Sequence, residues 1–290
     1  MPMTAIILAA GEGTRMKSRH PKVMHKLLDR PLVSWVTRAA RNAGADRIIV
    51  VVGNGAEEVR AHLASETDVE CVEQAERLGT GHATRVAIEA AGVTEGPVVV
   101  LNGDLPLIES ETIRAFADSV TGGEHACAVL TMTPPDPFGY GRIELASDGS
   151  VERIVEQKDC TPEQDANLLE CNAGCYAFDG ALLCKYIGEV GCDNAQHEYY
   201  LPDMVQILRA HGHATTITHC PDYVEGLGVN SRIQLAQVTK VMQRRINHAH
   251  MAAGVTMVDP DQVWIGPDVK IAQDVELLPQ VMLMGGTEIG

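Results

Sequence analysis

The sequence predicts a Rossmann-like α/β fold with a mixed sheet, followed by a long helix and the start of a hexapeptide-repeat β-helix. Three patterns lead to this fold class. Short β-rich apolar runs alternate with helical patterns up to about residue 120, which is typical of βαβ units and a parallel sheet. A long helical stretch begins near residue 231, and apolar residues recur every six positions in the C-terminal segment.

Four apolar runs in the first half of the chain are expected to form parallel strands. They are Ala5 to Ala10, Arg47 to Val52, Val69 to Val72 and Pro97 to Leu101. Between the first two runs, the segment from Leu32 to Asn42 has an apolar helical face, and Gly44 provides a stop signal. Right-handed crossovers would bring the loops after the strands to one edge of the sheet, where ligands of such folds bind.

From about residue 126 the pattern changes to strands separated by turns, which indicates a mixed region added to the same sheet. The expected strands cover residues 126–131, 142–145, 151–155 and 171–178. The helical stretch from about Ser231 to Ala253 then leads away as a linker helix. We therefore expect a main domain over residues 1–230, a linker helix over 231–254 and a repeat segment over 255–290.

The repeat segment has the spacing of a hexapeptide parallel β-helix. One apolar position recurs at Ile265, Ile271, Leu277, Leu283 and Ile289, and a second recurs at Val269, Val275 and Val281. The alternative is an ordinary pair of strands whose spacing arises by chance.

Composition limits the function. The 290 residues include 23 lysines and arginines and 39 aspartates and glutamates, which gives a formal net charge of -16. This charge repels polyanions over long range and argues against nucleic-acid binding. The eight cysteines include no C-x-x-C pair, which favours reduced thiols over a zinc site. The first apolar run has no basic leader and is too short to span a membrane, so we expect no membrane association and a cytoplasmic location.

A glycine-rich loop follows the first predicted strand. Gly11 and Gly13 permit positive φ and close backbone approach, so the amides of this loop can form a concavity for phosphate oxygens. The sixth position of a dinucleotide fingerprint would be Met16, and no G-K-[ST] follows, so neither of those phosphate-loop motifs is present. A flexible turn is the alternative, but Arg15 and Lys22 supply local countercharge for phosphate.

Two later loops carry further polar groups. Gln74 offers the donor and acceptor that a uracil edge requires, and Gly79 and Thr80 present backbone and hydroxyl groups at a helix start. The alternative is that they form a simple N-cap. Asp104 follows the strand that ends at Leu101, where a carboxylate is a natural ligand for Mg²⁺. Asp104 could instead cap the helix near Ser110, but Ser110 can cap that helix itself.

The run LAAGEGTRMKSRHPKVMHKL resembles the signature of sugar-1-phosphate nucleotidyltransferases, and P-K-V-x-H narrows the resemblance to the N-acetylglucosamine-1-phosphate uridylyltransferases. The resemblance implies that Arg15 stabilises the departing pyrophosphate and that Lys22 contacts the reacting phosphates. It assigns the nucleotide to a loop and three later positions, namely Leu8, Ala9, Ala10, Gly11, Gly13, Gln74, Gly79 and Thr80. Many family members carry Gln where this chain has Arg77, a change outside the expected contacts.

The same resemblance implies the metal and sugar residues. Asp104 and Asn230 would be the magnesium ligands, although Asn230 alone would be interpreted as the N-cap of the following helix. The implied sugar contacts are Gly103, Gly141, Glu156, Asn172 and Asn230. Pro202 stands where the family usually has Thr.

The resemblance further implies Mg²⁺-dependent transfer of UMP from UTP to N-acetylglucosamine-1-phosphate, for cell-envelope precursor synthesis. Family members continue into a left-handed β-helix that forms homotrimers and transfers an acetyl group, so we expect this chain to be a fragment without that second activity and with weaker association. Two alternatives remain open. One is a nucleotidyltransferase for thymidine or another hexose phosphate, and the other is a noncatalytic relative.

Overall fold

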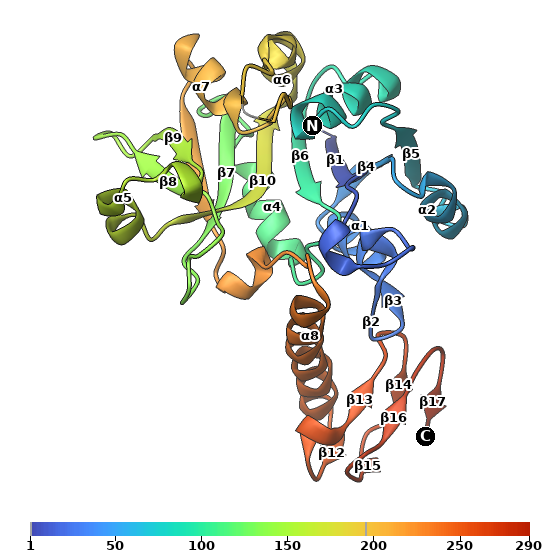
Figure 1. Ribbon diagram of the computed structural model, residues 1–290. Helices are drawn as coiled ribbons and strands as arrows, with labels where there is room; N and C mark the ends of the chain where they lie inside the picture. The colour runs from blue at the N-terminus through green and yellow to red at the C-terminus, as the bar shows by residue number, and fades with distance from the viewer. Residues whose placement is uncertain (1, 195) are drawn as a thin grey trace.

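The computed structural model describes residues 2–194 and 196–290. At its centre is a mixed sheet with the strand order β11-β7-β10-β6-β1-β4-β5 (Figure 1). Strands from the first half of the chain pair in parallel: β1 (Met3–Ala9), β4 (Ala45–Val52), β5 (Val69–Glu73) and β6 (Pro97–Asn102). These strands confirm the four predicted runs, with small differences at their ends.

The second half of the chain extends the same sheet. Strand β10 (Cys171–Asp179) runs antiparallel between β6 and β7 (Cys127–Met132), and β11 (Thr215–His219) lies parallel to β7 at the edge. A hairpin of β8 (Arg142–Leu145) and β9 (Val151–Val155) joins the sheet through β10. Because β10 is antiparallel to its neighbours, the sheet is mixed, as the change of pattern after residue 126 predicts.

Helices cover both faces of the sheet because alternate side chains of each strand point to opposite faces. The helices of the main body are α1 (Leu32–Asn42), α2 (Ala56–Leu63), α3 (Thr80–Ala91), α4 (Ser110–Asp118), α5 (Pro162–Asn167), α6 (Gly180–Tyr186) and α7 (Asp203–Ala210). Ile7 of β1 belongs to an apolar cluster with α1, α2 and α4, whereas Ile6 belongs to a cluster with α3, α6 and α7. Helix α1 begins and ends at the predicted residues.

The start of α4 differs from the expectation that Ser110 caps it. Glu109 is the N-cap residue, and the Ser110 hydroxyl donates to the neighbouring Glu111 carboxylate instead. The backbone N–H of Glu109 donates to Oε2 of Glu225 at 3.0 Å. A carboxylate that is distant in the sequence therefore satisfies the first exposed donor of this helix.

Helix α8 (Arg232–Ala252) leads from the sheet to a smaller C-terminal part (Figure 1). The short strands of this C-terminal part are β12 (Thr256–Met257), β13 (Trp264–Ile265), β14 (Lys270–Ile271), β15 (Glu276–Leu277), β16 (Met282–Leu283) and β17 (Glu288–Ile289). They pair in parallel as β12 with β15, β13 with β16 and β14 with β17. Ile265 lies opposite Leu283, three six-residue repeats further on, so the hexad spacing also sets the pairing.

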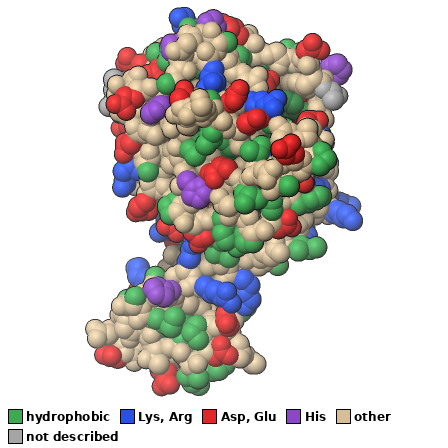
Figure 2. All heavy atoms as spheres, turned by 90° about the vertical axis from the view of Figure 1, so that its left-hand side faces the viewer, with side chains coloured by type: hydrophobic (Ala, Val, Ile, Leu, Met, Phe, Trp, Pro, Cys, Tyr) green, Lys and Arg blue, Asp and Glu red, His purple; other side chains and the backbone are tan. Residues whose placement is uncertain are grey.

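Polar side chains attach this part to α8 and to a small hairpin, β2 (Lys26–Leu27) with β3 (Arg30–Pro31). The buried amides of Gln243 and Asn247 donate to the carbonyl of Val263 at 2.5 and 2.9 Å. Arg30 forms a two-oxygen ion pair with Asp268. Figure 2 shows the larger body joined to the smaller part through a narrower waist.

Two further findings concern the cysteines and the search for membrane-spanning helices. The eight cysteines are free thiols, and each is buried or partly buried. No helix in the described part of the chain is long and apolar enough to cross a membrane.

Candidate active site

Three adjoining cavities open at the carboxyl ends of β1 and β6. The first, of about 630 Å³, lies between the glycine loop after β1 and the start of α3. The second, of about 320 Å³, lies between the end of β6 and the loops before β8 and α8. The third, of about 800 Å³, extends over β9 and the start of α7. Asn102, at the end of β6, lines all three, so they form one continuous site.

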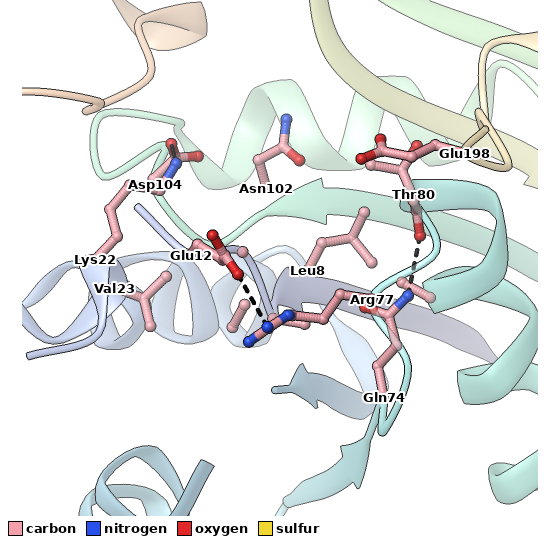
Figure 3. Close-up of a pocket in the computed structure, with 15 residues that line it drawn as sticks. Leu8, Glu12, Lys22, Val23, Gln74, Arg77, Thr80, Asn102, Asp104 and Glu198 are labelled. Carbon is pink, nitrogen blue, oxygen red and sulfur yellow. Dashed lines mark hydrogen bonds and ion pairs between the residues drawn. The ribbon is translucent and has the colours of Figure 1, made fainter. Parts of the chain in front are cut away.

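The glycine loop forms one wall of the first cavity (Figure 3). Its lining residues include the predicted Leu8, Ala9, Ala10 and Gly11. Gly13 is not among the lining residues of the three cavities, but it has φ 61°, and a Cβ there would lie 2.6 Å from Cβ of Lys22. Glycine at this position therefore allows Lys22 to approach the loop. Gly11 does not adopt the positive φ that the sequence allows.

Lys22 connects the loop with the predicted metal ligands. Its Nζ donates to Oδ2 of Asp104 at 2.5 Å and to Oδ1 of Asn230 at 3.1 Å. The three residues come from separate segments: Lys22 from a short 3₁₀ helix, Asp104 from the loop after β6, and Asn230 from the segment before α8. All three line the second cavity, and Lys22 and Asp104 also line the first. The predicted catalytic lysine and metal ligands therefore lie together where the cavities meet.

Asn230 is free for this role because another residue caps α8. The Ser231 hydroxyl accepts the backbone N–H of Gln234, and Asn230 contributes only its own N–H, to Oε1 of Gln234. The interpretation of Asn230 as the N-cap is therefore wrong.

The donor set fits a divalent cation. Asp104 and Asn230 direct two hard oxygens at one cationic group, and Mg²⁺ prefers such oxygens with one or two protein ligands. Gly228 lies beside them, and a Cβ there would be in ordinary contact with Nδ2 of Asn230 at 3.5 Å and with Oδ2 of Asp104 at 3.7 Å. Within the described residues, no group of three or more His, Cys, Asp or Glu side chains could hold a metal. Mg²⁺ usually completes its shell with substrate phosphates and water.

The opposite wall of the first cavity comes from the β5–α3 loop. Gln74, Gly79 and Thr80 all line it, as predicted. The Gln74 Nε2 already donates to the Gly79 carbonyl at 3.0 Å, so this amide stabilises the loop as well as facing the cavity. Gly79 has φ 104°, and a Cβ there would lie 2.6 Å from the Tyr199 carbonyl oxygen. The loop therefore packs closely against residues 198–201.

The predicted sugar residues divide into two groups. Gly141, Glu156, Asn172 and Asn230 line the second cavity. Gly103 is not among the lining residues of any of the three cavities; it is buried, and its N–H donates to the Leu8 carbonyl at 2.9 Å. Gly103 therefore joins the loop after β6 to the end of β1, and a Cβ at this position would lie 3.1 Å from the Leu8 carbonyl oxygen.

Arg142 is a site-building residue that the sequence did not identify. Its side chain is 1% exposed and donates to the carbonyls of Pro137 and Tyr140 at 2.7 and 2.6 Å. It also forms an ion pair with Asp165 of α5 at 2.8 Å. These bonds fix the loop that ends in Gly141, so Arg142 stabilises one wall of the second cavity. An arginine beside a glycine turn gives no signal that it will be buried.

Three charged residues of the first cavity, Glu12, Arg77 and Glu198, were also missed, and one predicted residue lies elsewhere. Arg77, expected outside the contacts, lines the cavity and pairs with Glu12 at 2.9 Å (Figure 3). Arg15 is exposed on the short 3₁₀ helix Thr14–Met16 and is not among the lining residues.

The charges of the first cavity sum to a small negative value. Its lining includes the carboxylates of Glu12, Asp104 and Glu198 but only two cationic side chains, Lys22 and Arg77. A polyphosphate would therefore meet net repulsion unless additional positive charge came with it. This balance is consistent with a ligand that enters together with a metal ion.

Comparison with protein families and curated proteins gives two results. Residues 5–154 match the model of the MobA-like NTP transferase domain. The chain is 47% identical over 285 residues to the bifunctional protein GlmU of Lactobacillus johnsonii, covering 98% of this chain and 61% of that protein. It is 43% identical to the bifunctional protein GlmU of Geobacter sulfurreducens, covering 99% of this chain and 60% of that protein. The chain thus spans about three fifths of these relatives.

Among solved structures, a similar fold occurs in a Bacillus anthracis protein assigned as a glucose-1-phosphate thymidylyltransferase and crystallised with sucrose. The TM-score is 0.67 at 18% sequence identity, and the match covers 82% of this chain and 94% of that one. At this identity the likeness concerns the fold alone.

Proposed function

Since the chain belongs to the MobA-like NTP transferase family, we propose that this nucleotidyltransferase moves UMP from UTP to N-acetylglucosamine-1-phosphate and releases pyrophosphate. The convergence of Lys22, Asp104 and Asn230 carries the proposal. These side chains lie where the first and second cavities meet, which is where two bound substrates would bring their phosphates together.

The first cavity suits the nucleotide. The backbone from Leu8 to Gly11 would hold the phosphates, because amides of a glycine loop form a concavity for anions. Gln74 lines the opposite wall and retains its amide oxygen as an acceptor for the N3–H of uracil. The preference for uracil rests on the groups that Gln74 offers, and the nucleotide profile measured below tests it.

The second cavity suits the sugar phosphate. Glu156 and Asn172 line it with hydrogen-bonding groups, which hydroxyl and acetamido groups of a hexosamine can satisfy. The Asn172 amide is already oriented, since it donates to Oη of Tyr176 at 2.7 Å and accepts the Gly174 N–H at 2.8 Å. Arg142 stabilises this wall by donating to the Tyr140 carbonyl. Discrimination for the N-acetyl group would reside in these loops.

Alignment and charge neutralisation would supply catalysis. The sugar phosphate is ionised at neutral pH, so its oxygen can attack the α-phosphorus of UTP without a catalytic base, and the bond to pyrophosphate breaks. Asp104 and Asn230 would hold Mg²⁺, which would supply charge neutralisation on the phosphates. Lys22 would contact the reacting phosphates, and Arg15, exposed near the loop, would stabilise departing pyrophosphate.

The remaining assignments extend the same proposal. Residues 1–230 would form the catalytic domain, 231–254 the linker helix, and 255–290 the start of a left-handed β-helix, whose parallel pairing of hexads supports this assignment. A longer protein of this family would use that β-helix to form a homotrimer. We place the reaction in cell-envelope precursor synthesis in the cytoplasm.

One assay tests the proposal and its alternatives. Pyrophosphate release is measured across UTP, dTTP and CTP with N-acetylglucosamine-1-phosphate, glucosamine-1-phosphate and glucose-1-phosphate, each with Mg²⁺ and with EDTA. We expect strong preference for UTP with N-acetylglucosamine-1-phosphate and loss of turnover in EDTA. Preference for dTTP with glucose-1-phosphate would favour a thymidylyltransferase, and no turnover with any pair would favour a noncatalytic relative.

A further inference from the structure

We propose that Arg77 sets the affinity for the nucleotide by neutralising the carboxylate of Glu12, which faces the space for the triphosphate. The inference rests on the proposed function, because it takes the first cavity as the nucleotide site. It gives a role to two residues that sequence reasoning did not include among the site residues.

The two side chains connect opposite walls of the first cavity. Glu12 belongs to the glycine loop after β1, and Arg77 belongs to the loop between β5 and α3. The guanidinium Nη2 of Arg77 lies 2.9 Å from Oε1 of Glu12, and both residues line the cavity (Figure 3). The ion pair therefore lies where a nucleotide between the two loops would contact it.

Glu12 creates an electrostatic problem for an anionic ligand. It directly follows Gly11, so its carboxylate lies beside the end of the segment, Leu8 to Gly11, whose backbone would hold the phosphates. An unpaired carboxylate there would repel a triphosphate. Lys22 is already engaged by Asp104 and Asn230. Of the cations in the cavity lining, Arg77 is the one that pairs with Glu12.

The ion pair is expected to contribute little to the free energy of folding. Its side chains are 46% and 57% exposed, and exposed ion pairs contribute little to folding. Its effect on a ligand with several negative charges can be larger, because each phosphate charge interacts with the unpaired carboxylate. After screening by water, salt and bound Mg²⁺, we expect roughly a three- to tenfold effect on the dissociation constant.

The alternative is that Arg77 leaves Glu12 and contacts the phosphates directly. The two mechanisms differ in a double-mutant cycle. If Arg77 acts by neutralising Glu12, removal of the Glu12 charge makes Arg77 dispensable. If Arg77 binds phosphate, its loss weakens the nucleotide whether or not Glu12 is charged.

The test is calorimetric titration of UTP with Mg²⁺ into the wild type, Arg77→Gln, Glu12→Gln and the double variant. We expect Arg77→Gln to raise the dissociation constant roughly three- to tenfold and Glu12→Gln to lower it modestly, and the double variant to recover most of the lost affinity. The loss in Arg77→Gln should shrink at high salt, because the charges are exposed.

A matched ion pair outside the cavities provides the control. Arg60 lies 3.1 Å from Glu73, and these side chains are 40% and 56% exposed, close to the values for the cavity pair. Arg60→Gln should leave the UTP affinity unchanged. A general effect of surface charge would lower affinity in both arginine variants and would overturn the proposal.

The remaining outcomes separate this inference from the proposed function. Wild-type affinity in Arg77→Gln, or a loss that persists in the double variant, would overturn the role of the pair while leaving the proposed function intact. If the wild type binds neither UTP nor another nucleoside triphosphate, the proposed function fails and this inference fails with it.

Discussion

The ammonium nitrogen of Lys22 lies 2.5 Å from Oδ2 of Asp104, although the two residues are 82 positions apart in the sequence. The same nitrogen lies 3.1 Å from Oδ1 of Asn230. A positive group already occupies the position between the two oxygens that would hold Mg²⁺. Metal binding must therefore move this ammonium group away, and Lys22 then becomes free to contact phosphate.

Lys22→Met tests this exchange by removing the charge while keeping most of the side-chain length. The Asp104 side chain is only 10% exposed, so losing its ionic partner should lower the melting temperature in EDTA by about 2–6 °C. Mg²⁺ should raise the melting temperature of the variant more than that of the wild type. In the variant the ion does not compete with an ammonium group for Asp104 and Asn230. Thermal melting at several Mg²⁺ concentrations checks this. Equal Mg²⁺ shifts in both proteins would contradict it.

Asp104→Asn should separate catalysis from folding. The substitution keeps the size of the side chain but removes the charge that would hold Mg²⁺, so turnover should fall by roughly two orders of magnitude or more. Steady-state kinetics at increasing Mg²⁺ should also show a higher half-saturating concentration. Asp118→Asn, at the exposed end of α4, is the control and should behave as the wild type. Near wild-type turnover in Asp104→Asn would make the metal assignment wrong.

Arg15 and Arg19 provide a matched comparison, because both are exposed on the segment after the glycine loop. Arg15→Ala should lower turnover by roughly tenfold or more, since Arg15 would stabilise charge on departing pyrophosphate. Arg19→Ala should have little effect. Neither should change the melting temperature appreciably, because both side chains are exposed. If pyrophosphate release falls equally in both variants, Arg15 has no specific role.

The strands and the glycine loop could be predicted from sequence because local patterns specify them. Val98 to Leu101 are all buried in β6, and a continuous apolar run indicates such a strand. Asp104 follows that strand directly, so its position at the sheet edge could be inferred as well. The hexad spacing likewise predicted short parallel strands in the C-terminal segment, where Ile271 lies opposite Ile289.

The residues that were missed depend on contacts between distant segments. Glu225 accepts the Glu109 N–H across 116 positions, and Arg142 is buried although arginine is usually exposed. The Glu12–Arg77 pair joins two loops that are separated by two helices and two strands of the main sheet along the chain. Such contacts leave no periodicity in the sequence, so Ser110 was expected to cap α4 and Arg77 was expected outside the site.

Glu225→Gln should change the pH dependence of stability. Burial raises the pKa of the Glu225 carboxyl above its ordinary value of 4.5, and the neighbouring Glu109 raises it further, while bonds from Thr112 and the Glu109 N–H and the charge of Arg245 lower it. The native state therefore binds this proton more tightly than the unfolded chain does. Its contribution to stability is complete below about pH 4.5 and is lost as the pH rises through the raised pKa.

The substituted glutamine side chain cannot ionise, yet it keeps an oxygen that accepts the Glu109 N–H. We expect the melting temperature of the Glu225→Gln variant to increase relative to that of the wild type as the pH rises above about 4.5. Melting curves from about pH 4 to pH 8 check this. A gain that appears only on acidification would reverse the sign of the pKa shift and contradict the prediction.

Gly13→Ala should damage the site through Lys22, and Gly92→Ala is its matched control. Both glycines have φ 61°, so alanine at either position should cost about 1–2 kcal/mol of stability. A Cβ at position 13 would lie 2.6 Å from Cβ of Lys22, whereas a Cβ at position 92, after α3, meets nothing within 4 Å. Gly13→Ala should therefore lose more melting temperature than Gly92→Ala, because the clash adds to the cost of the backbone conformation. Only Gly13→Ala should also lose turnover, by roughly tenfold or more, because Lys22 is displaced from the phosphates. Melting curves and pyrophosphate release on both variants check this, and equal turnover in the two proteins would show that the position of Lys22 does not depend on Gly13.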